Sequence, residues 1–219
     1  MPPARKEHDR AGAARALLFA IVAYAVFLAL GLVVAHAPPG PFDVASHVLI
    51  GHSALIAWIL SWTLYMQVLA PICLVLIAVA IAKPEWRVRI AVSLAVLLVM
   101  WFASDQLQHV FLRARRLDWV VKHETAFSYP SGHATLAVAF YGYWAYVLYK
   151  SELPLRVRLW GAALLTMLIT GVLWARLALG AHYPSDVTGG ALLGTSGICF
   201  AVAVCRFLQV PLDAGSPGR

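Results

Sequence analysis

The sequence predicts an all-α integral membrane protein, built as one bundle of six membrane-spanning helices. Of its 219 residues, 62% are hydrophobic and only 12% are charged, about half the charged share of an ordinary soluble domain. The mean hydropathy is +0.78, and several apolar runs reach the roughly 20 residues that a helix needs to cross a bilayer. Polar and charged residues gather in the short segments between these runs. The length suits one compact bundle without a separate soluble domain.

The apolar runs place the elements in order along the chain. We expect six spans, at residues 16–37, 63–82, 90–112, 132–149, 159–175 and 187–205. Residues 44–82 contain no Asp, Glu, Lys or Arg, yet their first part is more polar because it holds Ser46, His47, His52 and Ser53. We therefore expect an interfacial or re-entrant helix over residues 44–62, after the first span. The predicted domains are a basic cytoplasmic N-terminus (1–15), a membrane domain (16–205) and a disordered cytoplasmic tail (206–219).

The distribution of positive charge predicts the topology. If residues 44–82 cross the membrane once, twelve of the 17 Lys and Arg residues share the side of the N-terminus. Two crossings would divide them almost evenly, so the positive-inside rule favours one crossing and two cytoplasmic termini. The same spread over short loops argues against a nucleic-acid partner, despite the formal net charge of +7. Five cations remain on the outer face and need a functional reason: Arg113, Arg115, Arg116, Lys122 and Arg176.

Two polar motifs lie where a polar segment meets an apolar run. The first is Tyr129-Pro130-Ser131-Gly132-His133, and the second runs from Arg176 through His182-Tyr183-Pro184-Ser185-Asp186. Proline suits the first turn of a helix, because its missing N–H would have no partner there. Pro130 and Pro184 therefore predict two helix starts, and the free amides of a helix start bind anions. Together, the histidines, arginine, aspartate and helix starts predict a phosphate pocket.

These motifs resemble two signatures of the type 2 phosphatidic acid phosphatase superfamily, whose pocket is also similar to that of vanadium haloperoxidases. Pro130-Ser131-Gly132-His133 matches the second signature. Arg176, His182 and Asp186 have the residue types and the spacing of the third. The resemblance extends roughly over residues 63–205 and includes the spacing of the apolar runs. It implies a membrane-embedded phosphatase of the bacterial, undecaprenyl-diphosphatase-like kind.

The family's first signature is present with changes. It consists of a lysine, six residues, an arginine and a proline; here Gln108, Arg115 and Arg116 occupy these three positions. In the family the lysine also contacts phosphate, whereas a glutamine donates a hydrogen bond without supplying charge. Arg113 lies where many members have an additional arginine. We expect Arg113, Arg116 or Lys122 to replace the missing charge.

The resemblance implies a two-step phosphoryl transfer. His182 would attack phosphorus and form a phosphohistidine, Asp186 would hold the imidazole in the reactive tautomer, and His133 would protonate the leaving oxygen and then activate water. Charge stabilisation by arginine makes a metal or other cofactor unnecessary in this scheme. The expected phosphate-binding residues are Arg115, Ser131, Gly132, Arg176, Arg113, Gln108 and Lys122.

The sequence leaves three functions open. The resemblance favours hydrolysis of a lipid phosphate or diphosphate at the outer face of a bacterial inner membrane. Undecaprenyl diphosphate is the leading substrate because that carrier is released on the outer face; phosphatidylglycerol phosphate, phosphatidic acid and lipid A, the last also as a phosphotransfer substrate, are alternatives. A weakened member that binds lipid phosphate without turnover is motivated by Gln108.

The third function, a transporter with a His and Asp relay, is disfavoured. Such a protein places ionisable residues inside several spans, and here every expected span except 90–112 has an interior free of Asp, Glu, Lys and Arg. The expected partners are the lipid substrate and membrane lipids, and the sequence predicts no particular oligomeric state.

Overall fold

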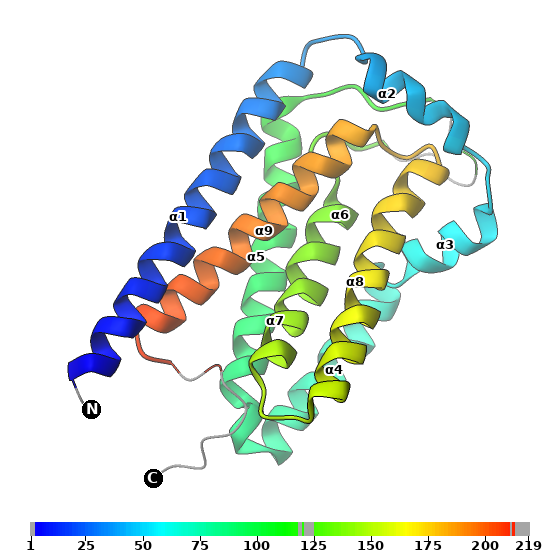
Figure 1. Cartoon of the computed structure of the whole chain (residues 1–219). Coiled ribbons are helices and arrows are strands. Elements are labelled where there is room, and N and C mark those ends of the chain that lie inside the picture. The colour runs from blue at the N-terminus through cyan, green and yellow to red at the C-terminus, as the bar shows by residue number, and fades with distance from the viewer. Residues whose placement is uncertain (1–2, 118–119, 121–124, 211, 213–219) are drawn as a thin grey trace.

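The computed structural model describes residues 3–117, 120, 125–210 and 212, and within this part of the chain every regular element is helical. The longest helices are α1 (Pro3–Val34), α5 (Arg87–Phe111), α8 (Leu155–Ala178) and α9 (Pro184–Phe207). They extend between the two ends of an elongated bundle (Figure 1). Because α1 begins at Pro3, the described part of the basic N-terminal segment continues directly into the first apolar helix.

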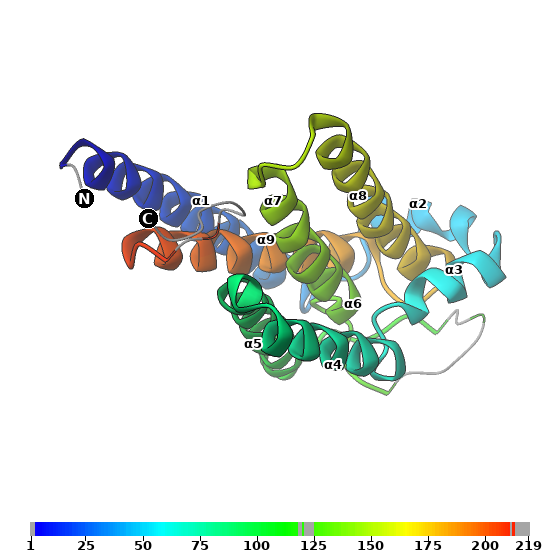
Figure 2. The same cartoon turned by 90° about the horizontal axis from the view of Figure 1, so that it is seen from below.

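The centre of the bundle is formed by α9 and by three helical segments that follow one another without a break. These are α6 (Gly132–Leu136), the π-helical turn η3 (Ala137–Tyr141) and α7 (Gly142–Lys150). Helix α9 packs lengthwise on α1 and also contacts α5 and α6, while α7 contacts α8. Seen along the bundle, α9 therefore lies between α1 and the α6–α7 segment (Figure 2).

Residues 41–82 form four helices, which corrects the expectation of one interfacial or re-entrant helix over residues 44–62. The helices are α2 (Pro41–Ala45), η1 (Ser46–Leu49), α3 (Ala54–Trp62) and α4 (Met66–Ala82). The break after η1 coincides with left-handed backbone at Gly51 and Ser53, which a continuing helix cannot accommodate. Helix α2 lies over one end of the bundle and α3 packs on α8 (Figure 1).

Five described helical stretches are long and apolar enough to cross a membrane: Asp9–Val34, Ala54–Ala82, Pro84–Phe111, Leu155–Ala178 and Pro184–Phe207. The helical segment from Gly132 to Lys150 is not among them, so the count of six spans stays a prediction. The start of α1, the end of α9 and the connection from α7 to α8 lie at one end of the bundle, and α2 lies at the other (Figure 1). This arrangement is the one expected if residues 44–82 cross once, whereas the side that faces the cytoplasm stays a prediction.

Glycines on α9 allow its backbone to touch that of α6. A Cβ atom on Gly190 would lie 2.5 Å from the carbonyl oxygen of Ser131, and one on Gly194 would lie 2.6 Å from that of Thr135. Both distances are far below van der Waals contact, so a larger residue would push the two helices apart. Small residues commonly permit such approaches between membrane helices. This close packing fixes the distance between the first turns of α6 and α9.

The loop before α6 is anchored on α1. The hydroxyl of Tyr129 donates to the carbonyl oxygen of Phe27 at 2.6 Å, and the two rings stack with their centroids 5.5 Å apart. Tyr129 is fully buried, and a Cβ on Gly189 of α9 would collide with its ring. Helices α1 and α9 thus hold the residue that immediately precedes the Pro-Ser-Gly-His motif.

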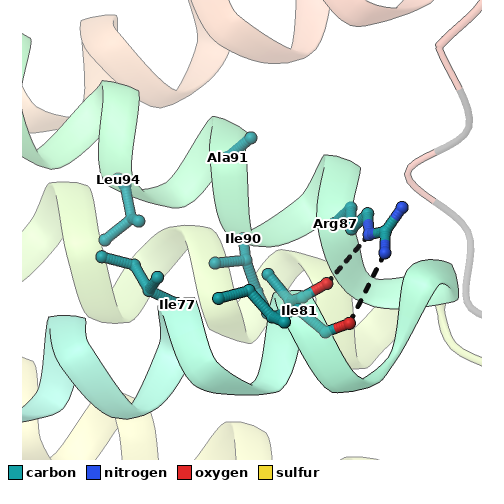
Figure 3. A pocket seen from close by; sticks show the side chains of 7 residues that line it. Ile77, Ile81, Arg87, Ile90, Ala91 and Leu94 are labelled. Atoms are coloured by element: carbon teal, nitrogen blue, oxygen red, sulfur yellow. Dashed lines mark hydrogen bonds between the residues drawn. The ribbon is translucent and has the colours of Figure 1, made fainter.

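A cavity of about 330 Å³ lies between the end of α4 and the start of α5 (Figure 3). Its walls are apolar, and at its rim the guanidinium of Arg87 donates to the carbonyl oxygens of Ala80 and Ile81 at 3.0 and 3.5 Å. These bonds satisfy carbonyl groups that the last turn of α4 leaves open. Arg87 and Gln108 lie at opposite ends of α5, about 30 Å apart at the helical rise per residue. This cavity is therefore separate from the two motifs.

Candidate active site

The two motifs meet at the end of the bundle opposite the termini, where α6 and α9 begin. Pro184 is the first residue of α9, as predicted. Pro130 instead precedes the N-cap of α6: Ser131 occupies that position and accepts a hydrogen bond from the Ala134 amide at 3.4 Å. Serine is a much better N-cap than proline, which explains the start one residue later. The amide of Ser131 donates to the carbonyl oxygen of Asp186 at 3.1 Å, so the two helix starts are joined directly.

His182 is held in one orientation by contacts to both ring nitrogens. Nδ1 lies 2.9 Å from the carbonyl oxygen of Ser128, which only accepts, so Nδ1 carries the proton. Nε2 is then the unprotonated nitrogen, and its lone pair accepts a hydrogen bond from Nη1 of Arg115 at 3.3 Å. The residue is only 1% exposed, and burial, together with the charge of Arg115, lowers the pKa of His182 to about 4. His182 is therefore neutral at pH 7 and available as a nucleophile.

Asp186 supports this ring from a short distance instead of bonding it directly. Its Oδ2 lies 3.7 Å from Nδ1 of His182, and accepts hydrogen bonds from the hydroxyl of Ser128 at 2.6 Å and from the amide of Tyr183 at 2.8 Å. Its Oδ1 accepts from Nη1 of Arg113. The carboxylate thus holds the hydroxyl of Ser128, and the carbonyl of Ser128 in turn holds His182. The carboxylate also places a negative charge beside the imidazole ring.

Arg115 connects the segment after α5 to the segment before α9. Its Nε donates to the carbonyl oxygen of Ala126 at 2.8 Å, Nη2 to that of Phe127 at 2.8 Å and Nη1 to that of Ala181 at 3.2 Å. These bonds hold the guanidinium beside Nε2 of His182. An arginine fixed in this way supplies positive charge where a phosphoryl group on Nε2 would lie.

Arg176 and His133 complete the group of residues that the structure brings together. Arg176 is fully buried at the end of α8, and its Nη1 donates to the hydroxyl of Ser61 on α3 at 2.7 Å. The charges of Arg115 and Arg176 act on both His133 and His182. Gly132, in the first turn of α6, leaves space in front of its backbone, since a Cβ there would meet only the hydroxyl of Ser104 at 3.7 Å.

A second cavity, of about 250 Å³, opens beside His133 between α4, α5 and α6. Its lining is mostly apolar, with Ser104, Asp105 and Gln108 as polar members besides His133. The ring of Tyr65 meets that of His133 edge-on at 4.8 Å between centroids, and Nε2 of His133 has no hydrogen-bond partner among the described residues. Gln108 donates to the carbonyl oxygen of Pro130 at 2.9 Å. Gln108, at the position of the family lysine, therefore supports the backbone of the Pro-Ser-Gly-His motif in this chain.

The cations expected to replace that lysine have other contacts. Arg113 forms ion pairs with Asp43 and Asp186. Arg116 donates to the hydroxyl of Ser46 at 2.8 Å and lies over the ring of Tyr183. Lys122 lies outside the described residues, so its predicted role stays untested. Asp43 and Ser128 contribute to the site without having been predicted, and neither lies in a spaced motif.

The fold is that of a helical membrane protein in which the two polar motifs meet at two joined helix starts. Residues 100–209 match the family profile described as PAP2 superfamily, and the chain belongs to this superfamily. The resemblance found in the spaced motifs is thereby confirmed. The matched range includes His133, His182 and all three signature regions.

Two curated relatives carry the names of lipid phosphatases. One comes from Escherichia coli (strain K12) and has the provisional name undecaprenyl-diphosphatase YbjG. It is 31% identical to this chain over 53% of this chain and 55% of the relative. The other is phosphatidylglycerophosphatase B of Bacillus subtilis (strain 168), with 31% identity over 45% of this chain and 51% of the relative. The chain thus matches about half the length of these relatives.

A solved structure shares the fold over most of both chains. It is the crystal structure of a transmembrane PAP2 type phosphatidylglycerolphosphate phosphatase from Bacillus subtilis, with a TM-score of 0.74 and 20% identity. The superposition covers 88% of this chain and 97% of that one. The expected all-α membrane fold is confirmed.

Proposed function

We propose that this protein hydrolyses a lipid phosphate or diphosphate through a phosphohistidine intermediate, without a metal ion. The observation that carries this proposal is the geometry of His182. Its Nδ1 donates to the carbonyl of Ser128, and its unprotonated Nε2 accepts from the guanidinium of Arg115 at 3.3 Å. A neutral, oriented imidazole beside fixed positive charge is what attack on a phosphate anion requires.

The reaction proceeds in two steps. Nε2 of His182 attacks phosphorus, the bond between phosphorus and the leaving oxygen breaks, and His133 donates a proton to that oxygen. His133, now neutral, takes a proton from water, whose oxygen attacks phosphorus; the bond between phosphorus and Nε2 of His182 breaks and inorganic phosphate is released. Arg115, Arg176 and the helix start at Ser131 and Gly132 stabilise the phosphoryl oxygens.

The negative charge near His182 has its own function in this scheme. The imidazole ring becomes positively charged once Nε2 is phosphorylated. Asp186 lies 3.7 Å from Nδ1, so its carboxylate stabilises that charge, while Ser128 continues to accept the Nδ1 proton. Asp186 thus performs the supporting role that the family resemblance implies, at a longer distance than a direct hydrogen bond.

The cavity beside His133 supports a lipid as the leaving group. Its apolar wall includes Leu64, Met66, Leu69, Trp101 and Leu136, and such a surface suits an acyl or isoprenoid chain better than water. We keep undecaprenyl diphosphate as the leading substrate, and phosphatidylglycerol phosphate and lipid A phosphates as alternatives. In the proposed topology the termini are cytoplasmic and the site faces the outer side of a bacterial inner membrane.

A second candidate function is binding of lipid phosphate without efficient turnover. The observation that favours it is Gln108, which supplies no charge and donates to the Pro130 carbonyl. Phosphate release distinguishes the two candidates. The assay uses detergent-purified protein with EDTA and tests undecaprenyl diphosphate, phosphatidylglycerol phosphate, phosphatidic acid and lipid A separately.

His182→Ala is the decisive variant in that assay, and His36→Ala is its matched control, because His36 is exposed and lies outside both motifs. We expect metal-independent release from at least one lipid, abolished by His182→Ala and retained by His36→Ala. Release that persists in His182→Ala would exclude a phosphohistidine at this residue. Binding of all four lipids without release by the unmodified protein would establish the second function.

A further inference from the structure

Asp43 lies on α2, outside the segment that matches the superfamily, yet it contacts the residues around the nucleophile. It is 4% exposed. Its carboxylate accepts hydrogen bonds from the amide of Ser185 at 3.1 Å and from the hydroxyl of the same residue at 2.7 and 2.8 Å, across 142 positions of sequence. Nη2 of Arg113 donates to it at 2.8 Å. Asp43 therefore binds the first turn of α9 directly.

One guanidinium connects Asp43 to Asp186. While Nη2 of Arg113 pairs with Asp43, Nη1 pairs with Asp186 and also donates to the hydroxyl of Ser185 at 2.7 Å. The guanidinium lies over the ring of Tyr183, 4.7 Å from its centroid. Arg113 thus bridges two buried carboxylates. Each depends on it, because a buried charge without a partner is strongly destabilising.

We propose that Asp43 is a positioning residue for His182, acting through Arg113 and Ser185. This inference rests on the proposed function. Without the Asp43 charge, Arg113 is free to place both nitrogens on Asp186 in the bidentate geometry that a guanidinium prefers. Asp186 would then turn away from the Ser128 hydroxyl, and the carbonyl that fixes the proton on Nδ1 of His182 would lose its support.

Charge balance gives Asp43 a second contribution to the same step. Asp43, Arg113 and Asp186 together carry one net negative charge. That charge complements the positive ring that forms when Nε2 of His182 is phosphorylated. An asparagine at position 43 would leave Arg113 and Asp186 neutral as a pair, so the phosphohistidine would form more slowly, in addition to the effect of the displaced Asp186.

The test compares Asp43→Asn with Ser46→Ala. Ser46 lies on the neighbouring turn and contacts Arg116 and the Asp43 carbonyl, so its variant disturbs the same segment without removing a charge. We expect Asp43→Asn to lower kcat roughly 100-fold, the effect of a misplacement of about 1 Å, with KM unchanged. Ser46→Ala should stay close to the unmodified protein. Equal losses in both variants, or full activity in Asp43→Asn, would overturn the proposal.

Two further measurements extend the test, and the second of them does not depend on activity. Arg113→Lys keeps the charge but cannot bridge two carboxylates in one plane, and we expect it to reproduce the loss in kcat; a rise in KM alone would instead mean that Arg113 binds phosphate. Nitrogen-15 NMR of histidine-labelled protein reads the His182 tautomer without substrate. We expect the proton on Nδ1 in the unmodified protein and a mixture of tautomers in Asp43→Asn. An unchanged tautomer in that variant would overturn the positioning role even if no lipid were hydrolysed.

Discussion

His182 and His133 belong to one proposed reaction, but their surroundings differ. Both ring nitrogens of His182 have close neighbours, at 2.9 Å to the Ser128 carbonyl and 3.3 Å to the Arg115 guanidinium. His133 borders a cavity of about 250 Å³, and its Nε2 has no hydrogen-bond partner within the described ranges. The difference teaches which half of the site is organised before substrate binds. A nucleophile gains from a fixed approach, whereas a general acid must meet leaving groups of varied shape.

The two halves also draw on different parts of the chain. The surroundings of His182 come from α2, the segment after α5 and the start of α9. Those of His133 come from α4, α5 and α6, with mostly apolar side chains. Changes to one half should therefore affect the formation of the phosphohistidine, and changes to the other should affect the departure of the lipid.

The largest expected effect separates the two histidines by the leaving group. His133→Asn should slow hydrolysis of an alkyl lipid phosphate by about 10²- to 10⁴-fold, the usual contribution of general acid catalysis. With an aryl phosphate such as 4-nitrophenyl phosphate, the leaving 4-nitrophenolate needs no protonation. Its burst of 4-nitrophenolate should therefore persist in His133→Asn and vanish in His182→Ala. Rapid-quench measurement of the burst checks this. A burst equally reduced for both substrates would contradict the assignment of His133 as the acid.

A smaller effect is expected when the two halves are moved apart. Gly190→Ala places a Cβ 2.5 Å from the Ser131 carbonyl, a backbone atom that cannot move without the first turn of α6. We expect kcat/KM to fall by up to roughly 100-fold. The control is Gly142→Ala on α7. Its new Cβ comes closest, at 2.9 Å, to the end of the flexible Ile198 side chain on α9 and not to backbone, so activity should largely remain. Similar losses in both variants would mean that helix packing in general, and not the spacing of the motifs, limits activity.

The smallest expected effect concerns the half around His133. Gln108→Lys restores the family residue and adds positive charge at a cavity whose lining also includes Asp105. We expect a few-fold rise in kcat/KM, greater for a diphosphate than for a monophosphate because the second phosphate adds negative charge. Gln106→Lys, at an exposed position outside the lining, is the matched control. An equal rise in both variants would point to general attraction of anionic lipid instead of a contact in the cavity.

The sequence was sufficient to predict the helix starts near Pro130 and Pro184 and the residues of the two spaced motifs. The spacing of these residues along the chain reflects local helical structure. Asp43 could not be found in this way: it is a lone acidic residue after a Pro- and Gly-rich turn, and only the folded chain brings it to Ser185. Ser128 acts through its backbone carbonyl, which no side-chain pattern reveals. For Arg113 the need for a cation was predicted, but its partner Asp43 depends on how α2 folds over the bundle.

The interfacial segment was predicted less well for a similar reason. Its composition indicates a polar stretch near the membrane surface, but the break between η1 and α3 depends on left-handed backbone at Gly51 and Ser53. Serine has no strong preference for that conformation. The short helices that result allow Ser46 and Asp43 to face the arginines after α5, an arrangement that one continuous helix would not give.

The bond between Tyr129 and Phe27 has a consequence for how this molecule can be divided. Residues 100–209 carry the superfamily match, yet the hydroxyl of Tyr129 finds its acceptor on α1, and its ring stacks on a residue of the same helix. The matched segment is therefore not an autonomous module. If it were excised or grafted onto a foreign first helix, a buried phenol would lose its acceptor directly next to the helix of His133, the proposed general acid. For this contact the matched segment needs the N-terminal helix as well.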